Sequence, residues 1–441
     1  MNAMTRSNAT LDLVERLRSG ETTAVEAMRF YLRRIGEREK EVRAFAYLAP
    51  EAAITAAERA DAAKASGLGL GPLHGLPVAV KDIIDTADMP TEFGGEIFAS
   101  RRPAHDATIV RRLRSAGAIV VGKAVTSQYA LFVPGPTRNP HDLARTPGGS
   151  SSGSAAAVAA GFVPVALGTQ TNGSIIRPAS YCGVVGFKPS LGLLPRTGVL
   201  RHAPLMDHPG VFARTVADAA MVIDSIGGED AEDAFSRPLP GSLLAAAEAE
   251  GPPPKLAFTL GPFEDRADPA TRAAFAAFIA SLPVKADEIA LGPEFAKAEA
   301  AMSDLMCAGV AESLGPDIDR ARDRVPDRVL AIVAEGRALS AIRLMQAWTR
   351  RDALRADAAR LIAPYDAVLT FASSGPAPLA SEGTGDPIFA TLWSLIGAPT
   401  MSLPLMRAAN GLPIGVQAVG APGRDLDLTR AAAWLMRARA R

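Results

Sequence analysis

Two serine-rich loops stand close together in the sequence: Thr146-Pro-Gly-Gly-Ser-Ser-Ser-Gly-Ser154 and, after a short alanine-rich run, Gly168-Thr-Gln-Thr-Asn-Gly-Ser-Ile-Ile-Arg-Pro-Ala179. Between them, residues 155–160 have high helix propensity, and the glycine and proline that follow can end a helix. Residues 162–167 form a short apolar run typical of a buried strand. The order of loop, helix, strand and loop could bring two serines close together.

Each loop has a simpler interpretation when it is taken alone. A Gly-Gly-Ser-Ser-Ser-Gly-Ser run is also typical of a flexible linker, and Asn172-Gly173 is a hairpin-turn signal. A linker is not usually followed at once by a patterned helix and strand. At a helix N-terminus, Ser150 to Ser152 would lie where backbone N–H groups favour developing negative charge.

Residues 149–153 also fit the Gly-x-Ser-x-Gly nucleophile elbow of the α/β-hydrolases. That interpretation requires an acid and then a histidine later in the chain. The later histidines are His202 and His208, and the one acid between Ser151 and His208 is Asp207. Adjacent Asp207 and His208 cannot form a relay to a distant serine, so the elbow interpretation fails.

Composition limits the classes of protein to consider. The chain has 441 residues, of which 48% are hydrophobic, enough for a large core in one or two domains. Lysine plus arginine and aspartate plus glutamate both number 47, which argues against a nucleic-acid-binding surface over the whole molecule. Two distant cysteines, Cys182 and Cys307, suit neither a disulfide scaffold nor a zinc cluster and favour a reducing cytoplasm.

We expect neither a membrane anchor nor a metal. The first ten residues lack the apolar centre of a signal peptide, and the most apolar run, residues 155–167, is too short to span a bilayer. The chain has few histidines and no His-Glu-x-x-His or comparable metal-ligand run. The sequence therefore predicts a cytoplasmic protein with no metal, no organic cofactor and no membrane contact.

Helical periodicity alternates with short apolar strands along the chain, which indicates an α/β fold. We expect helices at 10–19, 22–35, 50–66, 107–116, 214–225 and 426–437, and strands at 78–80, 118–122, 162–167, 181–188, 367–371, 400–404 and 413–417. The predicted organisation is an N-terminal helical region over residues 1–65 and a continuous domain over 66–441. A helical excursion is expected over about 227–360.

Lys81 follows the predicted strand at residues 78–80. It is either a solvated residue at the strand end or a lysine half-buried beside the serine loops. Burial would lower its pKa from the reference value of about 10.4 and make it a competent general base. Gln128 and Tyr129 are candidates for a pocket wall, although a solvated helix start explains them as well.

Amide hydrolysis requires a nucleophile, a proton path to the leaving amine and donors for the oxyanion. A Ser–Ser–Lys relay with backbone donors meets these needs. Lys81, residues 148–154, Gly173-Ser174 and Arg177-Pro-Ala resemble the amidase signature family, in family order and from about residue 10 to the C-terminus. Closer resemblance to the malonamidases comes from Lys-Asp-Ile-Ile-Asp-Thr, Met-Pro-Thr-Glu and Ser-Ile-Ile-Arg-Pro-Ala.

This resemblance implies a fold and a set of roles. The implied fold is one large domain with a mixed β-sheet covered by helices on both faces. Ser174 would be the acyl-accepting nucleophile, Ser150 the proton shuttle held through a cis peptide bond, and Lys81 its base. The implied oxyanion donors are the backbone N–H groups of Thr171, Asn172, Gly173 and Ser174.

Three positions depart from the commonest family pattern. Gln170 stands where most members have aspartate, and Asn172 replaces the first glycine of Gly-Gly-Ser. Arg177 lies three residues after the nucleophile rather than two, as in malonamidase-like proteins. By resemblance Arg177 would bind a substrate carboxylate. From its place in the chain, Gln128 is also expected to bind the substrate. The alternative is an arginine tied to a backbone carbonyl or to a structural acid.

The main functional hypothesis is an amidase for a small carboxylate-bearing amide, such as malonamate or a carboxylated urea derivative. It would form an acyl-enzyme on Ser174 and release ammonia. The alternative is the A subunit of a glutamine-dependent tRNA amidotransferase, which passes ammonia to a partner. A catalytically inactive binding protein on the same fold is a third hypothesis. The family resemblance suggests a homodimer and leaves open the presence of a small accessory protein.

Overall fold

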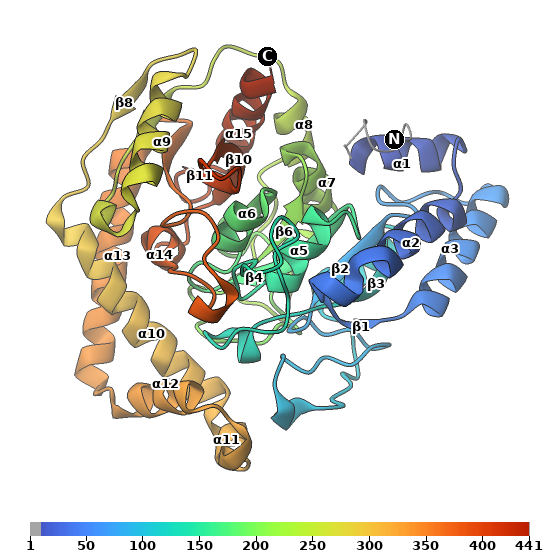
Figure 1. Ribbon diagram of the computed structural model, residues 1–441, viewed down its shortest axis with the longest axis horizontal. Coiled ribbons are helices and arrows are strands. Elements are labelled where there is room, and N and C mark those ends of the chain that lie inside the picture. Colours follow the sequence, from blue (N-terminus) through green and yellow to red (C-terminus); the bar gives the residue numbers. More distant parts are fainter. Residues whose placement is uncertain (1–9, 441) are drawn as a thin grey trace.

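The computed structural model describes residues 10–440, so residues 1–9, considered above for a signal peptide, lie outside the described part. Its centre is an eleven-stranded sheet in the order β1-β3-β2-β4-β6-β5-β10-β11-β9-β7-β8 (Figure 1). Among the described helices, none is long and apolar enough to cross a membrane.

The sheet is mixed, as predicted. β2 pairs in parallel with β3 and β4, and β7 pairs in parallel with β8 and β9, whereas the remaining pairs are antiparallel. The strands are β1 Phe45–Leu48, β2 Pro77–Lys81, β3 Ile119–Ala124, β4 Val165–Gln170, β5 Val185–Lys188, β6 His208–Ala213, β7 Leu256–Phe258, β8 Ala286–Glu288, β9 Ala367–Phe371, β10 Thr400–Arg407 and β11 Pro413–Val419.

Helices form two layers on this sheet. α5 and α6 pack against each other and against its central strands, whereas α7 packs with α4, α8 and α15. The helices are α1 Thr10–Ser19, α2 Ala24–Val42, α3 Pro50–Ala65, α4 Thr108–Ser115, α5 Ser152–Ala159, α6 Ile176–Cys182, α7 Val216–Ile226, α8 Leu243–Glu248, α9 Pro269–Ala280, α10 Ala298–Ser313, α11 Gly315–Asp319, α12 Asp327–Ala338, α13 Ala341–Ile362, α14 Ile388–Leu395 and α15 Asp425–Ala440. The predicted α/β class, with helices on both faces of one sheet, is confirmed.

Most of the predicted elements are present, with boundaries shifted by a few residues. The predicted strand over 181–188 is wrong in its first half. Residues up to Cys182 end α6, Gly183 closes that helix in the left-handed region at φ 64°, and the strand begins only at Val185. Left-handed backbone is the usual way to end a helix and costs glycine least.

Strand β1 joins the sheet through an antiparallel pairing with β3, so residues 45–48 share the sheet with the rest of the chain. The predicted excursion over 227–360 contains α8 to α12, most of α13, and the sheet strands β7 and β8. Helices α10 to α13 lie together beside the main body (Figure 1). The division at residue 65 remains a prediction.

Neighbouring parallel strands place the two serine loops next to the lysine. β2 and β4 pair with Val80 opposite Leu167, so Lys81 at the end of β2 lies beside the last residues of β4, directly before the second serine loop. α5 begins at Ser152 and contacts both strands. The carboxyl ends of parallel strands meet at one edge of a sheet, which is where open α/β sheets commonly form their sites.

Candidate active site

Lys81 is fully buried at the end of β2. Its Nζ donates hydrogen bonds to Ser150 Oγ at 2.7 Å and to Thr169 Oγ1 at 2.8 Å. Burial holds the pKa of Lys81 well below its usual value, and the charge of Asp207 opposes this effect in part. Of the two interpretations of Lys81, the structure shows the lysine beside the serine loops.

Ser150 differs from the serines that follow it. The Gly149–Ser150 peptide bond is cis, and Lys81 contacts the Ser150 hydroxyl. The Ser151 hydroxyl donates to the Thr169 carbonyl at 3.1 Å, and the Ser154 hydroxyl donates to the Leu167 carbonyl at 2.9 Å. These later serines therefore tie α5 to β4, and Ser150 is the one whose hydroxyl bonds to Lys81.

The Gln170 side chain organises the loop between β4 and α6. Its Oε1 accepts the backbone N–H groups of Ile175 at 2.7 Å and Ile176 at 3.0 Å. Its Nε2 donates to Ser394 Oγ at 2.8 Å, and the Ser394 hydroxyl donates in turn to the Asn172 carbonyl. The glutamine therefore holds both ends of the loop that carries Ser174.

Neighbouring groups also engage the side chains of Thr171 and Asn172. Thr171 Oγ1 donates to Asp207 Oδ1 at 2.5 Å, and Asn172 Oδ1 accepts from Thr391 Oγ1 at 2.8 Å. Within the described residues, the backbone N–H groups at positions 172–174 have no partner among the loop and turn hydrogen bonds. Such N–H groups can donate to a developing oxyanion.

Ser150 and Ser174 line one narrow cavity of about 20 Å³. The other lining residues are Ala130, Leu131, Phe132, Thr171, Asn172, Gly173, Arg177, His202, Met306 and Pro387. This volume is close to that of one water molecule. The structure therefore brings both serines, the predicted oxyanion loop and Arg177 together. Gln128 is not among these lining residues. The segment that lines the cavity begins two residues later, at Ala130.

Arg177 on α6 is buried against this cavity. One terminal nitrogen, Nη2, donates to the Gly149 carbonyl at 2.7 Å and to Thr384 Oγ1 at 3.4 Å. The other two nitrogens, Nε and Nη1, are buried without a partner. Burial lowers the pKa of Arg177, although a guanidinium remains charged in proteins. Arg177 thus has both a bond to a backbone carbonyl and unused donors.

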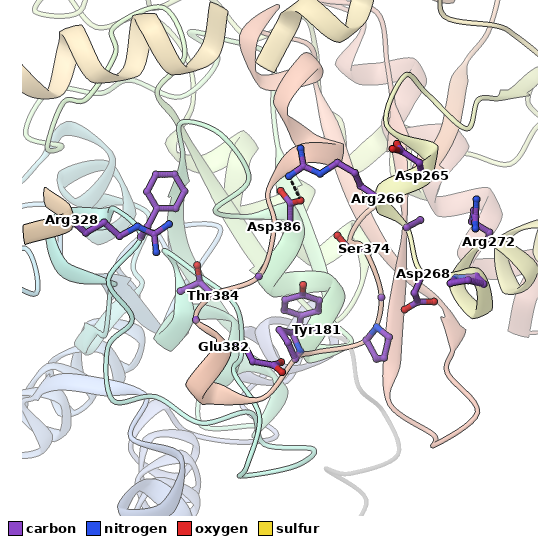
Figure 2. Close-up of a pocket in the computed structure, with 18 residues that line it drawn as sticks. Tyr181, Asp265, Arg266, Asp268, Arg272, Arg328, Ser374, Glu382, Thr384 and Asp386 are labelled. Atoms are coloured by element: carbon purple, nitrogen blue, oxygen red, sulfur yellow. Dashed lines mark hydrogen bonds and ion pairs between the residues drawn. The ribbon is translucent and has the colours of Figure 1, made fainter. Parts of the chain in front are cut away.

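Two larger cavities share lining residues with the narrow one. Phe132, Asn172, Met306 and Pro387 also line a cavity of about 350 Å³, and Phe132 and Arg328 lie between that cavity and an outer one of about 640 Å³. In the outer cavity, drawn in Figure 2, Arg266 pairs with Asp386, and Tyr181, Thr384 and Arg328 also line the wall. The shared residue Phe132 places both larger cavities next to the narrow one.

A further cavity, of about 510 Å³, lies behind the Ser174 loop. It shares Thr171 and His202 with the narrow cavity and is also lined by Thr169, Asp207 and His208. Asp207 Oδ2 accepts the backbone N–H groups of His202 and Ala203, each at 2.8 Å. Sequence reasoning considered His202 only as a relay partner and did not find its place in the cavity wall.

No set of three or more His, Cys, Asp or Glu side chains is placed to hold a metal ion within residues 10–440.

Comparison with known proteins identifies the family. Residues 26–428 match the family model described as Amidase. The A subunit of the glutamyl-tRNA(Gln) amidotransferase from Salinispora arenicola is 34% identical over 94% of both chains. The same-named protein from Chloroflexus aggregans is 44% identical over 52% of this chain and 49% of its own length, so that alignment spans about half of the relative.

A solved structure agrees with these matches. It is a vestigial protein complex described as revealing the evolutionary origins of an s-triazine catabolic enzyme, and its chain superposes with a TM-score of 0.90 at 29% identity, covering 97% of this chain and 98% of that one. The predicted resemblance to the family is confirmed, whereas the closer resemblance to malonamidases remains a prediction.

Proposed function

The chain belongs to the amidase family and is an enzyme that acts on carbon–nitrogen bonds, and from this premise we propose that it hydrolyses a carboxamide whose other end carries a carboxylate. The observation that carries this proposal is one cavity with Ser150, bonded to a buried lysine, Ser174 and an arginine with unused donors. Ammonia would be the first product.

The proposed reaction begins at Lys81. In its neutral form, Nζ accepts the Ser150 proton while it still donates to Thr169. Ser150 then takes the proton of Ser174 as the Ser174 oxygen attacks the amide carbonyl. The backbone N–H groups of the loop donate to the oxyanion, Ser150 gives the proton it took from Ser174 to the leaving nitrogen, and Lys81 returns its own proton to Ser150. Water repeats the sequence on the acyl-enzyme and releases the acid.

Arg177 supports a substrate with a carboxylate. A buried charge without a full set of partners is costly, and a carboxylate would both neutralise the guanidinium and accept from its free N–H groups. The narrow cavity favours a short distance between the carboxylate and the amide. Malonamate and carboxylated urea derivatives meet both conditions, and this is our first candidate for the substrate.

The second candidate is the A subunit of a glutamine-dependent tRNA amidotransferase. The names of the curated relatives favour it more directly than they favour a free-standing amidase, and one of those relatives aligns over 94% of both chains. Glutamine also carries a carboxamide and a carboxylate, so the same arginine could serve it. In that case the protein would work with partner proteins, whereas the first candidate is expected to be a cytoplasmic homodimer.

Ammonia release from purified protein tests the proposal. Malonamate should be turned over at least about tenfold better than its uncharged methyl ester, a difference of about 1.4 kcal/mol. Equal turnover of malonamate and its methyl ester would show that the enzyme does not recognise the carboxylate. If the protein hydrolyses glutamine, and does so faster when a copurifying partner is present, the second candidate, the amidotransferase A subunit, would be favoured.

A serine-reactive probe separates these enzymes from the third hypothesis, a non-catalytic protein. Labelling of Ser174 in the wild type and its loss in Ser174→Ala would support an active nucleophile. Absence of labelling, together with no ammonia from any of the three amides, would favour the non-catalytic protein. Mass measurement in solution would test the predicted homodimer and any small accessory protein in the same preparation.

A further inference from the structure

His202 forms part of the wall between the narrow cavity and the 510 Å³ cavity behind it. Its side chain is buried, and Asp207 fixes the backbone at this point by accepting the His202 N–H. The mechanism described above gives this residue no role. A histidine held rigidly against two reacting serines can nevertheless contact a bound substrate.

Hydrogen bonding defines which ring nitrogen is free. Nε2 is buried without a hydrogen-bond partner, and the backbone carbonyl of Tyr129 lies near the ring. With Nδ1–H facing that carbonyl, the neutral ring carries its lone pair on Nε2. Burial lowers the pKa of His202, and the charge of Asp207 opposes this effect in part, so the neutral ring is favoured at physiological pH. Nε2 can therefore accept a hydrogen bond, but no described residue donates one to it.

An unpaired buried acceptor is destabilising, and a substrate group that donates to it removes that cost. The other specific groups around the cavity are mainly donors, since Arg177 and the oxyanion loop offer only N–H groups. A scissile carboxamide brings N–H groups that need acceptors. The leaving nitrogen takes its proton from Ser150, and His202 lines the same narrow cavity as Ser150.

We propose that Nε2 of His202 accepts a hydrogen bond from the N–H of the scissile carboxamide and so selects primary amides over esters. This inference rests on the proposed function and adds the group that recognises the leaving nitrogen. An ester of the same acid has no N–H to offer and leaves Nε2 unpaired. Sites with unpaired polar groups discriminate strongly against analogues that lack the matching group.

The test compares malonamate with monomethyl malonate, which have the same acyl group and carboxylate but differ in the leaving group. His202→Phe keeps a planar ring and removes the acceptor, whereas His202→Gln keeps an acceptor near the position of Nε2. We expect His202→Phe to lower kcat/KM for the amide at least tenfold and to change that for the ester less than threefold. His202→Gln should recover part of the loss on the amide.

Two outcomes overturn the inference alone. An equal loss on both substrates would make His202 a structural residue, and no loss on either would mean that Nε2 does not contact the substrate. Unfolding midpoints of both variants show whether replacing the buried His202 ring has damaged the fold. Failure of the wild type on both malonyl substrates, and on glutamine and its γ-methyl ester tested as a second pair, would instead overturn the proposed function and this inference with it.

Discussion

Gln170 Nε2 donates a hydrogen bond to Ser394 Oγ at 2.8 Å, although the two residues are 224 positions apart in the chain. The hydroxyl of Ser394, on α14, in turn donates a hydrogen bond to the carbonyl of Asn172. The loop that presents Ser174 is therefore held from the C-terminal part of the fold as well as by its own glutamine. A preorganised oxyanion loop stabilises a transition state only if its donors stay in place.

Replacing Ser394 by alanine should weaken the oxyanion loop. The change leaves Gln170 Nε2 and the Asn172 carbonyl without their partner, so we expect a loss of about 1–3 kcal/mol in the free energy of unfolding. We also expect kcat to fall more than KM rises. Ser402→Ala is the matched control, because Ser402 Oγ is buried without a partner. Similar losses in both variants would contradict the role of Ser394.

Substitutions of the serines in the two loops should have different effects on activity and on stability. Ser174→Ala and Ser150→Ala are expected to lower kcat by about 10³-fold or more, in line with the removal of members of a catalytic triad. Ser151→Ala removes the hydroxyl that bonds to the Thr169 carbonyl, so it should lower stability while most of kcat remains. Full activity in Ser150→Ala would exclude Ser150 from the proton path.

Much of the site could be predicted because its chemistry lies in short motifs. Lys81 ends an apolar strand, and Ser150 and Ser174 lie in two glycine-rich loops separated by one helix and one strand. Such a unit folds locally, and the pairing of β2 with β4 then places the lysine next to the loops. Helix propensity and hydrophobic periodicity predict secondary structure well in segments that lie this close together in the sequence.

Contacts between distant segments could not be predicted in the same way. β6 was missed because Pro209 and Gly210 are poor residues for a central strand, yet it pairs with both β4 and β5. A Cβ at Gly210 would lie 2.4 Å from the Phe187 carbonyl oxygen, so close packing of backbones requires the glycine. Ser394 and His202 reach the site through tertiary packing, and nothing local in the sequence marks either residue.

The dependence of activity on pH should follow Lys81. Because burial lowers the pKa of this lysine, its neutral form appears at a lower pH than that of free lysine, and activity should be lost as the pH falls and the amine becomes protonated. Lys81→Met should lower kcat/KM by about 10²–10⁴-fold, the usual contribution of a general base. A profile of kcat/KM with an uncharged amide measures this limb.

The acidic limb should persist in His202→Gln, because its origin is the lysine rather than the histidine. An optimum below about pH 5, where even strongly perturbed buried lysines are protonated, would contradict the assignment of Lys81 as the base.

Arg177→Met should change which substrates are accepted more than it changes the reaction itself. The guanidinium has two buried nitrogens without partners, and we expect these to bind the carboxylate of the substrate. Its loss should lower kcat/KM for malonamate at least about tenfold, equivalent to about 1.4 kcal/mol, and leave the uncharged methyl ester within about threefold. Arg177→Lys keeps the charge but not the planar group, so it should recover only part of the activity on the acid.

Because Nη2 also bonds to the Gly149 carbonyl, beside Ser150, a structural role for Arg177 predicts an equal loss of kcat/KM on both substrates. The ratio of kcat/KM for malonamate to kcat/KM for its methyl ester therefore distinguishes carboxylate binding by Arg177 from a structural role in the loop that contains Gly149 and Ser150.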